Sequence, residues 1–177
     1  APPAPPPQDG AVALILTKPI GTGVIMAAHM QLAARGEWVE AAIASMAEGN
    51  AAAASALAPF APLMTDVTGF GLARHALNLA GRCARLGAEL DPAALPCLDG
   101  ALTLIESGYR STLHNQNRAA VRMSDDALSA HAIDILFDPQ TSGGLLAAVP
   151  ESEADTALAR LHGAGINAAR VGRLTDT

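Results

Sequence analysis

Aromatic side chains are scarce in this 177-residue chain and make up only 3% of it. Because half of the residues are hydrophobic, the core must be built mainly from Ala, Leu, Ile and Val, with few flat rings available for stacking. A chain of this size buries roughly 70% of the surface that its unfolded form exposes, so stability requires neither disulfides nor a structural metal. The length suits one domain.

Basic side chains are also few, with 11 Lys and Arg against 17 Asp and Glu and a net charge of −6. A nucleic-acid partner requires clustered basic residues that displace counterions from phosphate, so we expect none. No apolar run approaches the 18 or so residues of a membrane span, so we expect no membrane segment. Cys83 and Cys97 are too far apart for a Cys-x-x-Cys pair and form no disulfide framework. We therefore predict that both cysteines are reduced thiols and that the protein is cytoplasmic.

The order of apolar runs and turns predicts an α/β (α+β) layered domain, with a mixed β-sheet covered by helices. Residues 1–10 are rich in proline and are expected to form a linker or a disordered start, which leaves 11–177 as the domain. Residues 109–131 give no clear pattern. The clearer segments are strands at 11–17, 63–65, 145–149 and 168–174, helices at 24–35, 37–48, 70–79 and 151–162, and a helix capped by Asn50.

Gly21, Thr22 and Gly23 follow the first predicted strand and precede a helix. Such a turn can present backbone N–H groups to a phosphate, but Met26 does not fit a dinucleotide fingerprint and no Walker lysine follows. Spacing alone therefore favours a structural turn that needs positive φ. Lys18, at the end of the strand, is expected to be solvated, with a phosphate partner as the alternative.

In the segment TDVTGFG at 65–71, Asp66 ends a short strand, and Thr68 and two glycines open a helix. Thr68 can cap the helix, which leaves Asp66 for a hard cation such as Mg²⁺. A loop carboxylate bonded to nearby N–H groups explains the pattern equally well. The five histidines, at 29, 75, 114, 131 and 162, lack metal-ligand spacing, and His75 stands out only because it lies nine residues after Asp66.

DPQTSGG at 138–144 predicts a sharp connection into a strand, because it combines Pro139 with Gly143 and Gly144. The alternative is a loop in which Thr141 or Ser142 binds phosphate or orders a neighbouring loop. Met26, Met30 and Met46 fall on predicted helices and are expected to fill the core.

Three segments together, LTKPIGTGV at 16–24, TDVTGFGL at 65–72 and LFDPQTSGGLL at 136–146, resemble the carboxyl-terminal domain of selenophosphate synthetases (selenide, water dikinases). This family belongs to a superfamily with aminoimidazole ribonucleotide synthetase, whose members pair an ATP-binding domain with an α/β carboxyl-terminal domain. The resemblance covers about Ala11 to Leu174. Arg74 stands where the family is expected to have a small residue.

The resemblance implies a reaction that converts ATP, selenide and water into selenophosphate, AMP and orthophosphate, with Mg²⁺ bridging ATP to carboxylates. It implies that Asp66 is a metal ligand and that Gly21, Thr22, Gly23 and Thr68 contribute to the ATP cleft. The family's catalytic Cys or selenocysteine and Lys lie upstream of this sequence, so the chain alone is expected to be inactive. Its partner would be the missing amino-terminal ATP-binding domain, in a full-length homodimer. The alternatives are a non-catalytic structural or association domain and a domain of a sister enzyme.

Overall fold

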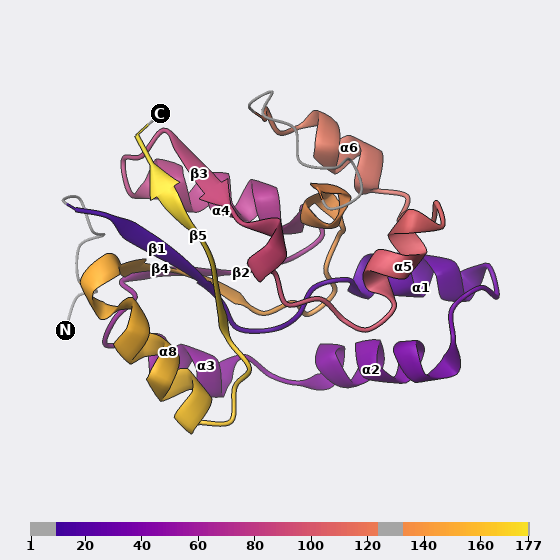
Figure 1. Cartoon of the computed structure of the whole chain (residues 1–177), viewed down its shortest axis with the longest axis horizontal. Coiled ribbons are helices and arrows are strands. Elements are labelled where there is room, and N and C mark those ends of the chain that lie inside the picture. The colour runs from indigo at the N-terminus through magenta and orange to yellow at the C-terminus, as the bar shows by residue number, and fades with distance from the viewer. Residues whose placement is uncertain (1–9, 124–132, 177) are drawn as a thin grey trace.

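The computed structural model describes residues 10–123 and 133–176 of the chain, and its five strands form one sheet in the order β2-β4-β1-β5-β3 (Figure 1). The four strand pairs are all antiparallel. The strands are β1 (Val12–Leu16), β2 (Leu63–Asp66), β3 (Gly87–Leu90), β4 (Leu145–Pro150) and β5 (Ala169–Thr175).

Helices and short 3₁₀ turns connect the strands and cover the sheet. The helices are α1 (Thr22–Met30), α2 (Gly36–Ala47), α3 (Ala51–Leu57), α4 (Gly71–Arg82), α5 (Ala101–Glu106), α6 (His114–Ala119) and α8 (Ala154–Gly163). The 3₁₀ turns are η1 (Pro92–Ala94), η2 (Ile135–Phe137) and η3 (Glu151–Glu153).

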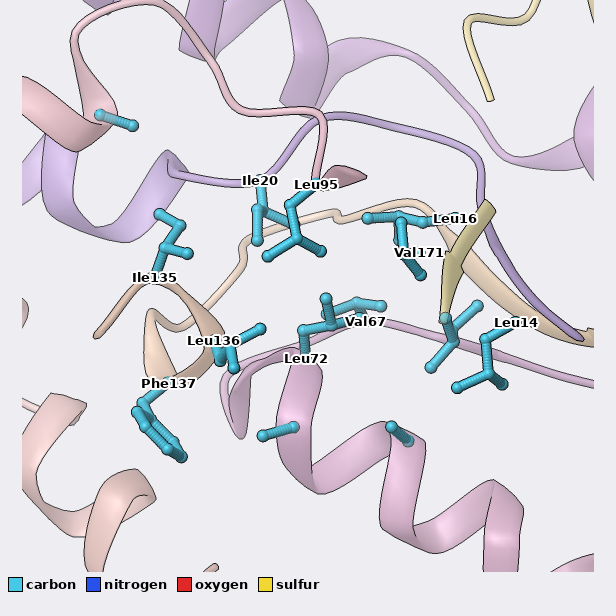
Figure 2. Close-up of a cluster of buried hydrophobic side chains, with 14 of the residues drawn as sticks. Leu14, Leu16, Ile20, Val67, Leu72, Leu95, Ile135, Leu136, Phe137 and Val171 are labelled. Atoms are coloured by element: carbon cyan, nitrogen blue, oxygen red, sulfur yellow. The ribbon is translucent and has the colours of Figure 1, made fainter. Parts of the chain in front are cut away.

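The alternation of side chains along the strands divides the core into two parts. Ile15 points toward α3 and α8, which lie together on one side of the sheet (Figure 1). Leu14 and Leu16 point to the other side, where a larger cluster includes residues of α1, α4 and α5. Figure 2 shows that Val67 and Leu72 lie beside Leu136 in this larger cluster. The segment after β2 and the segment before β4 therefore share one core.

The predicted α/β class, with helices covering one sheet, is confirmed. The expectation of a mixed sheet needs correction, because every strand pair in the described part of the chain is antiparallel. The parallel pairing in these residues is an isolated bridge between Ile20 and Cys97. A connection that contains a helix permits parallel pairing but does not require it, so the alternation of strands and helices did not fix the strand directions.

The first helix ends at Met30, five residues before the predicted end at Arg35, because the chain turns at Leu32, which has a φ of 60°. Met30 is 76% exposed, so its predicted place in the core is wrong. Helix α4 instead runs past Gly81 to Arg82. In the region that gave no clear pattern, the structure has α6, and residues 124–131 lie outside the described part. The predicted linker also lies outside it except for Gly10.

No helix in residues 10–123 and 133–176 has the length and apolar character of a membrane span. Both cysteines are free, and Cys83 is buried. Burial raises the pKa of Cys97 to about 11, with a smaller contribution from the nearby carboxylate of Asp138. Cys97 is therefore a poor nucleophile at neutral pH.

Candidate functional site

The three segments that carry the resemblance meet at one end of the sheet. Asp66, the last residue of β2, pairs with Leu145, the first of β4, and Leu16, the last of β1, pairs with Leu146. Because antiparallel neighbours run in opposite directions, the loops after β1 and β2 lie beside the loop that enters β4. A cavity of about 350 Å³ lies at this junction, and its lining includes Gly23, Gly69 and Thr141.

The N–H groups of the 21–23 turn are occupied by side chains of the 138–144 loop. The amide oxygen of Gln140 accepts from the backbone nitrogens of Gly21 at 3.0 Å and Thr22 at 3.2 Å, and from the Thr22 hydroxyl at 3.1 Å. Gln140 is 4% exposed. Its oxygen thus takes the place at the amino end of α1 that an anion takes in other proteins.

Asp138 completes this arrangement. Its carboxylate accepts from the backbone nitrogen of Gly23 at 3.1 Å and also from Val24. Burial raises the pKa of Asp138 to about 7, against the opposing effect of these N–H donors and of the Gln140 amide. A Cβ on Gly23 would lie 2.4 Å from the carbonyl oxygen of Pro139, so the close contact between the two loops requires glycine there.

Lys18 is buried, so the expectation of a solvated residue is wrong. Its ammonium group donates to the carbonyl oxygens of Ser45 at 3.0 Å, Glu48 at 2.5 Å and Ser142 at 3.0 Å. Burial lowers the pKa of Lys18, and Glu48 partly offsets this effect. Because α2 ends at Ala47, Lys18 supplies a cation and donors to the carboxyl end of that helix.

Asn50 precedes α3 as predicted, but its side chain does not cap the helix. Its amide nitrogen donates to the carbonyl oxygen of Gly143 at 2.9 Å. The Thr22 hydroxyl accepts from the backbone nitrogen of Thr141 at 3.1 Å. The 138–144 loop is therefore bonded to the first helix, to the start of the third helix and to Lys18, which indicates a structural role.

Asp66 is exposed, and within the described residues no hydrogen bond or ion pair engages its carboxylate. Thr22 and Gly23 line the cavity, whereas Asp66 and Thr68 do not. Thr68 is linked to the 21–23 turn through Gln140, whose backbone nitrogen donates to the Thr68 carbonyl oxygen and whose side chain bonds Gly21 and Thr22. No group of three His, Cys, Asp or Glu side chains able to hold a metal occurs in residues 10–123 and 133–176. A carboxylate oxygen is a suitable ligand for Mg²⁺, but Mg²⁺ binding would require further ligands from the nucleotide, water or another domain.

Several hydrogen bonds from other segments hold the backbone of residues 67–69. The nitrogen of Val67 donates to the carbonyl oxygen of Gly144, and the carbonyl oxygen of Thr68 accepts from the nitrogen of Gln140. The carbonyl oxygen of Gly69 accepts from the side-chain amide of Asn117 at 2.8 Å. An exposed carboxylate thus extends from a loop with a fixed backbone.

His75, on α4, holds the same loop. Its Nε2 accepts from the backbone nitrogen of Thr68 at 3.0 Å, and the Thr68 hydroxyl lies 3.1 Å from the same atom. Burial lowers the pKa of His75, and the negative charge of Asp66 partly opposes this shift. The Thr68 side chain therefore contacts the histidine and does not form the predicted helix cap.

The sequence analysis missed a charged cluster beside the cavity. The carboxylate of Asp134 accepts from Arg110 and Arg118, each at 2.5 Å, and His114 Nε2 lies 3.5 Å away. Burial alone would raise the pKa of Asp134, but Arg110 and the other cations lower it overall. The Nη1 atom of Arg110 donates to the carbonyl oxygens of Ile105 and Tyr109. The even spacing of basic residues from Arg110 to Arg118 was the available signal.

Residues 12–177 match the family model described as AIR synthase related protein, C-terminal domain, and the chain belongs to this family. It is similar to the selenide, water dikinase of Desulfitobacterium hafniense (strain Y51), with 38% identity over 92% of this chain and 48% of the relative. It is 40% identical to the selenide, water dikinase of Burkholderia orbicola over 92% of this chain and 47% of the relative. The chain spans about half the length of these relatives. The predicted resemblance to the carboxyl-terminal domain of selenophosphate synthetases is confirmed.

Solved structures share the fold at lower sequence identity. Thiamine-monophosphate kinase from Stenotrophomonas maltophilia K279a superposes with a TM-score of 0.68 at 16% identity, covering 96% of this chain and 49% of that one. HypE from E. coli superposes with a TM-score of 0.67 at 20% identity, covering 96% of this chain and 45% of that one. These likenesses confirm the fold.

Proposed function

We propose that this chain is the carboxyl-terminal domain of an enzyme that makes selenophosphate, AMP and orthophosphate from ATP, selenide and water. The observation that carries the proposal is that three separate segments of family-like sequence meet at one end of the sheet, where Asp66 is exposed and its carboxylate has no hydrogen bond or ion pair within the described residues. Identity of 35–40% to relatives named selenide, water dikinase favours this reaction over that of a sister enzyme.

Asp66 would bind Mg²⁺ together with oxygens from the nucleotide and from the missing half. Bound Mg²⁺ would neutralise charge on the polyphosphate and orient it. The chain's own contribution would be to hold Asp66 at the start of a loop with a fixed backbone, and Gly69 of this loop lines the 350 Å³ cavity. Gly23 and Thr22 line this cavity, and Thr68 adjoins Gly69 at its edge, so a nucleotide there would contact the turn and the loop together. The N–H groups of Gly21, Thr22 and Gly23 already have acceptors, so any contact with ATP would use other atoms of the turn.

The amino-terminal half is the proposed partner, and exposed apolar side chains support its docking at this end of the domain. Met30 and Leu113 line the cavity, and Phe70 follows Gly69; their exposed fractions are 76%, 45% and 63%. Such residues around a polar site are typical of an interface. A homodimer, a cytoplasmic location and inactivity of the isolated chain remain predictions.

One observation favours a second candidate function, a structural or association domain that binds no nucleotide. The amino end of α1 bonds to Gln140 and Asp138, so the most obvious phosphate site is filled by the protein itself. The two functions differ in their dependence on Asp66, because a purely structural domain has no need of an exposed carboxylate.

Phosphorus NMR under anaerobic conditions separates these functions. The test protein is the two-domain enzyme, in which an amino-terminal half, native or from the Desulfitobacterium hafniense relative, precedes this chain. We expect selenophosphate and AMP from ATP and selenide, and at least about a 100-fold loss of activity for Asp66→Asn, because metal charge stabilisation is worth several kcal/mol. Asp155→Asn, an exposed carboxylate on α8, is the matched control.

If both the parent and Asp66→Asn made selenophosphate, the proposed reaction would be supported and the metal-binding role of Asp66 would be contradicted. A folded two-domain enzyme that makes no selenophosphate would overturn the proposed reaction and favour the structural function. Loss of activity in Asp155→Asn as well would mean that the defect is not specific to the site.

A further inference from the structure

We infer that His75 is a positioning residue that fixes the loop Val67–Gly69 and so sets the direction of the Asp66 carboxylate. The inference rests on the proposed function, because it treats Asp66 as the metal ligand whose orientation matters. His75 is 7% exposed and lies on the second turn of α4, where its ring reaches back to the loop that precedes the helix.

The hydrogen bond from Thr68 defines the state of the ring. A backbone N–H can only donate, so Nε2 must accept, and the neutral ring then carries its proton on Nδ1. The Thr68 hydroxyl lies 3.1 Å from the same nitrogen. Because Nε2 is engaged from within the protein, His75 neither ligates a metal through this atom nor acts as a base there.

The loop has little freedom to rearrange around this contact. Gly71, which begins α4, has a φ of 76°, and a Cβ there would lie 2.8 Å from the carbonyl oxygen of Leu136. Asn117 holds the carbonyl of Gly69, and Gln140 holds that of Thr68. His75 accepts the hydrogen bond from the backbone nitrogen of Thr68, and Thr68 lies two residues after Asp66 in the chain.

Among the residues that the structure describes, none forms a hydrogen bond with the Asp66 carboxylate, so the place of this group depends on the backbone that carries it. Groups that orient a metal ligand typically contribute about 10- to 100-fold to metal affinity or activity. We therefore expect His75→Leu, which removes the acceptor, to raise the Mg²⁺ concentration for half-maximal activity of the two-domain enzyme at least about 10-fold. His75→Gln places an amide oxygen within reach of Thr68 and is expected to stay within about 3-fold of the parent.

His162→Leu is the matched control. His162 lies on α8, away from the loop, and its ring also bonds a backbone group, the carbonyl oxygen of Ala168. This variant should lower stability without changing the Mg²⁺ dependence. A Mg²⁺ dependence that is unchanged in His75→Leu, or equally changed in His162→Leu, would overturn the positioning role.

Two readouts need no turnover and keep this test separate from the test of the reaction. Nitrogen NMR of the imidazole in the unmodified two-domain enzyme should give the Nδ1–H tautomer for His75. Exchange of the Thr68 amide should be about 2- to 10-fold faster in His75→Leu than in His75→Gln, the range that loss of one hydrogen bond gives. An Nε2–H tautomer, or equal exchange rates of the Thr68 amide in the two variants, would contradict the inference even if selenophosphate were made. If both readouts gave the expected values but no selenophosphate formed, the loop contact would be supported and only the reaction would be overturned.

Discussion

The turn at 21–23 and the loop at 66–69 both lie between a strand and a helix, but they use their polar groups in opposite ways. In the turn, the N–H groups that could bind an anion donate to Gln140 and Asp138 within the protein. In the loop, the backbone is bonded inside the protein while the carboxylate of Asp66 is left exposed. The turn is internally satisfied, and the loop retains one free charged group.

This difference separates stability from activity. A buried donor that loses its acceptor bears the full cost of desolvation, so changes around the turn should mainly lower the free energy of unfolding. An exposed carboxylate contributes little to folding, so a change at Asp66 should mainly lower activity.

Gln140→Leu should cause the largest loss of stability, because it leaves the Gly21 and Thr22 nitrogens and the Thr22 hydroxyl without their acceptor. With about 1–3 kcal/mol for each unsatisfied buried group, we expect a loss of about 3 kcal/mol or more. This loss of stability is measured by urea unfolding of the two-domain enzyme, with a signal that comes from this domain. Gln116→Leu, on the exposed face of α6, is the control and should change stability by less than about 0.5 kcal/mol. A small effect at Gln140 would mean that the turn is not internally satisfied.

Lys18→Met should cost about 1–3 kcal/mol, because three carbonyl oxygens lose their shared donor while the desolvation cost of the ammonium is relieved. Lys18 is the chain's only lysine, so its burial can also be measured directly. An amine-reactive ester should modify the Lys18 peptide slowly in the folded protein and rapidly in urea, as read by mass spectrometry. Rapid modification of the folded protein would contradict the buried position.

Asp138→Asn should change how stability depends on pH. Burial raises the pKa of Asp138 to about 7, from an ordinary value of 3.8, so the folded state holds this proton more tightly than the unfolded state does. The resulting stability is fully present below about pH 4 and is lost as pH rises to about 7. The variant should lack this loss, so the difference in unfolding free energy between parent and variant should shift by a few kcal/mol between pH 4 and pH 7.5.

Asp134 has a lowered pKa, so it stabilises the fold at pH values above its pKa in the unfolded chain, and this stabilisation is lost as the pH falls. Parent and variant share this opposite trend, so it cancels in the difference between their unfolding free energies. Asp99→Asn, which replaces an exposed carboxylate, is the control and is measured over the same pH range. A profile of Asp138→Asn that runs parallel to that of the parent would show that the N–H donors at the amino end of α1 keep the carboxylate ionised.

The strands and the turns between them were predictable because apolar runs and glycines act locally. Val12–Leu16 and Leu145–Pro150 lie almost where the branched and apolar residues placed them. The burial of Lys18 was not predictable, because its three acceptors lie 27, 30 and 124 residues away. The sequence likewise placed Asp66 and Thr68 in one loop, but the bond between Thr68 and His75 depends on the direction in which α4 leaves that loop.

The smallest expected change is in the stability of Asp66→Asn, which should differ from the parent by less than about 0.5 kcal/mol in urea unfolding. The carboxylate has no bonding partner in the described residues to lose, and burial lowers the pKa of the neighbouring His75, which favours its neutral form. Asparagine has nearly the same shape, so the loop backbone should keep its bonds to Gly144, Gln140 and His75. A loss of more than about 1 kcal/mol would mean that Asp66 stabilises the loop itself. The loop would then resemble the turn, and any loss of activity in this variant could no longer be assigned to a missing metal ligand.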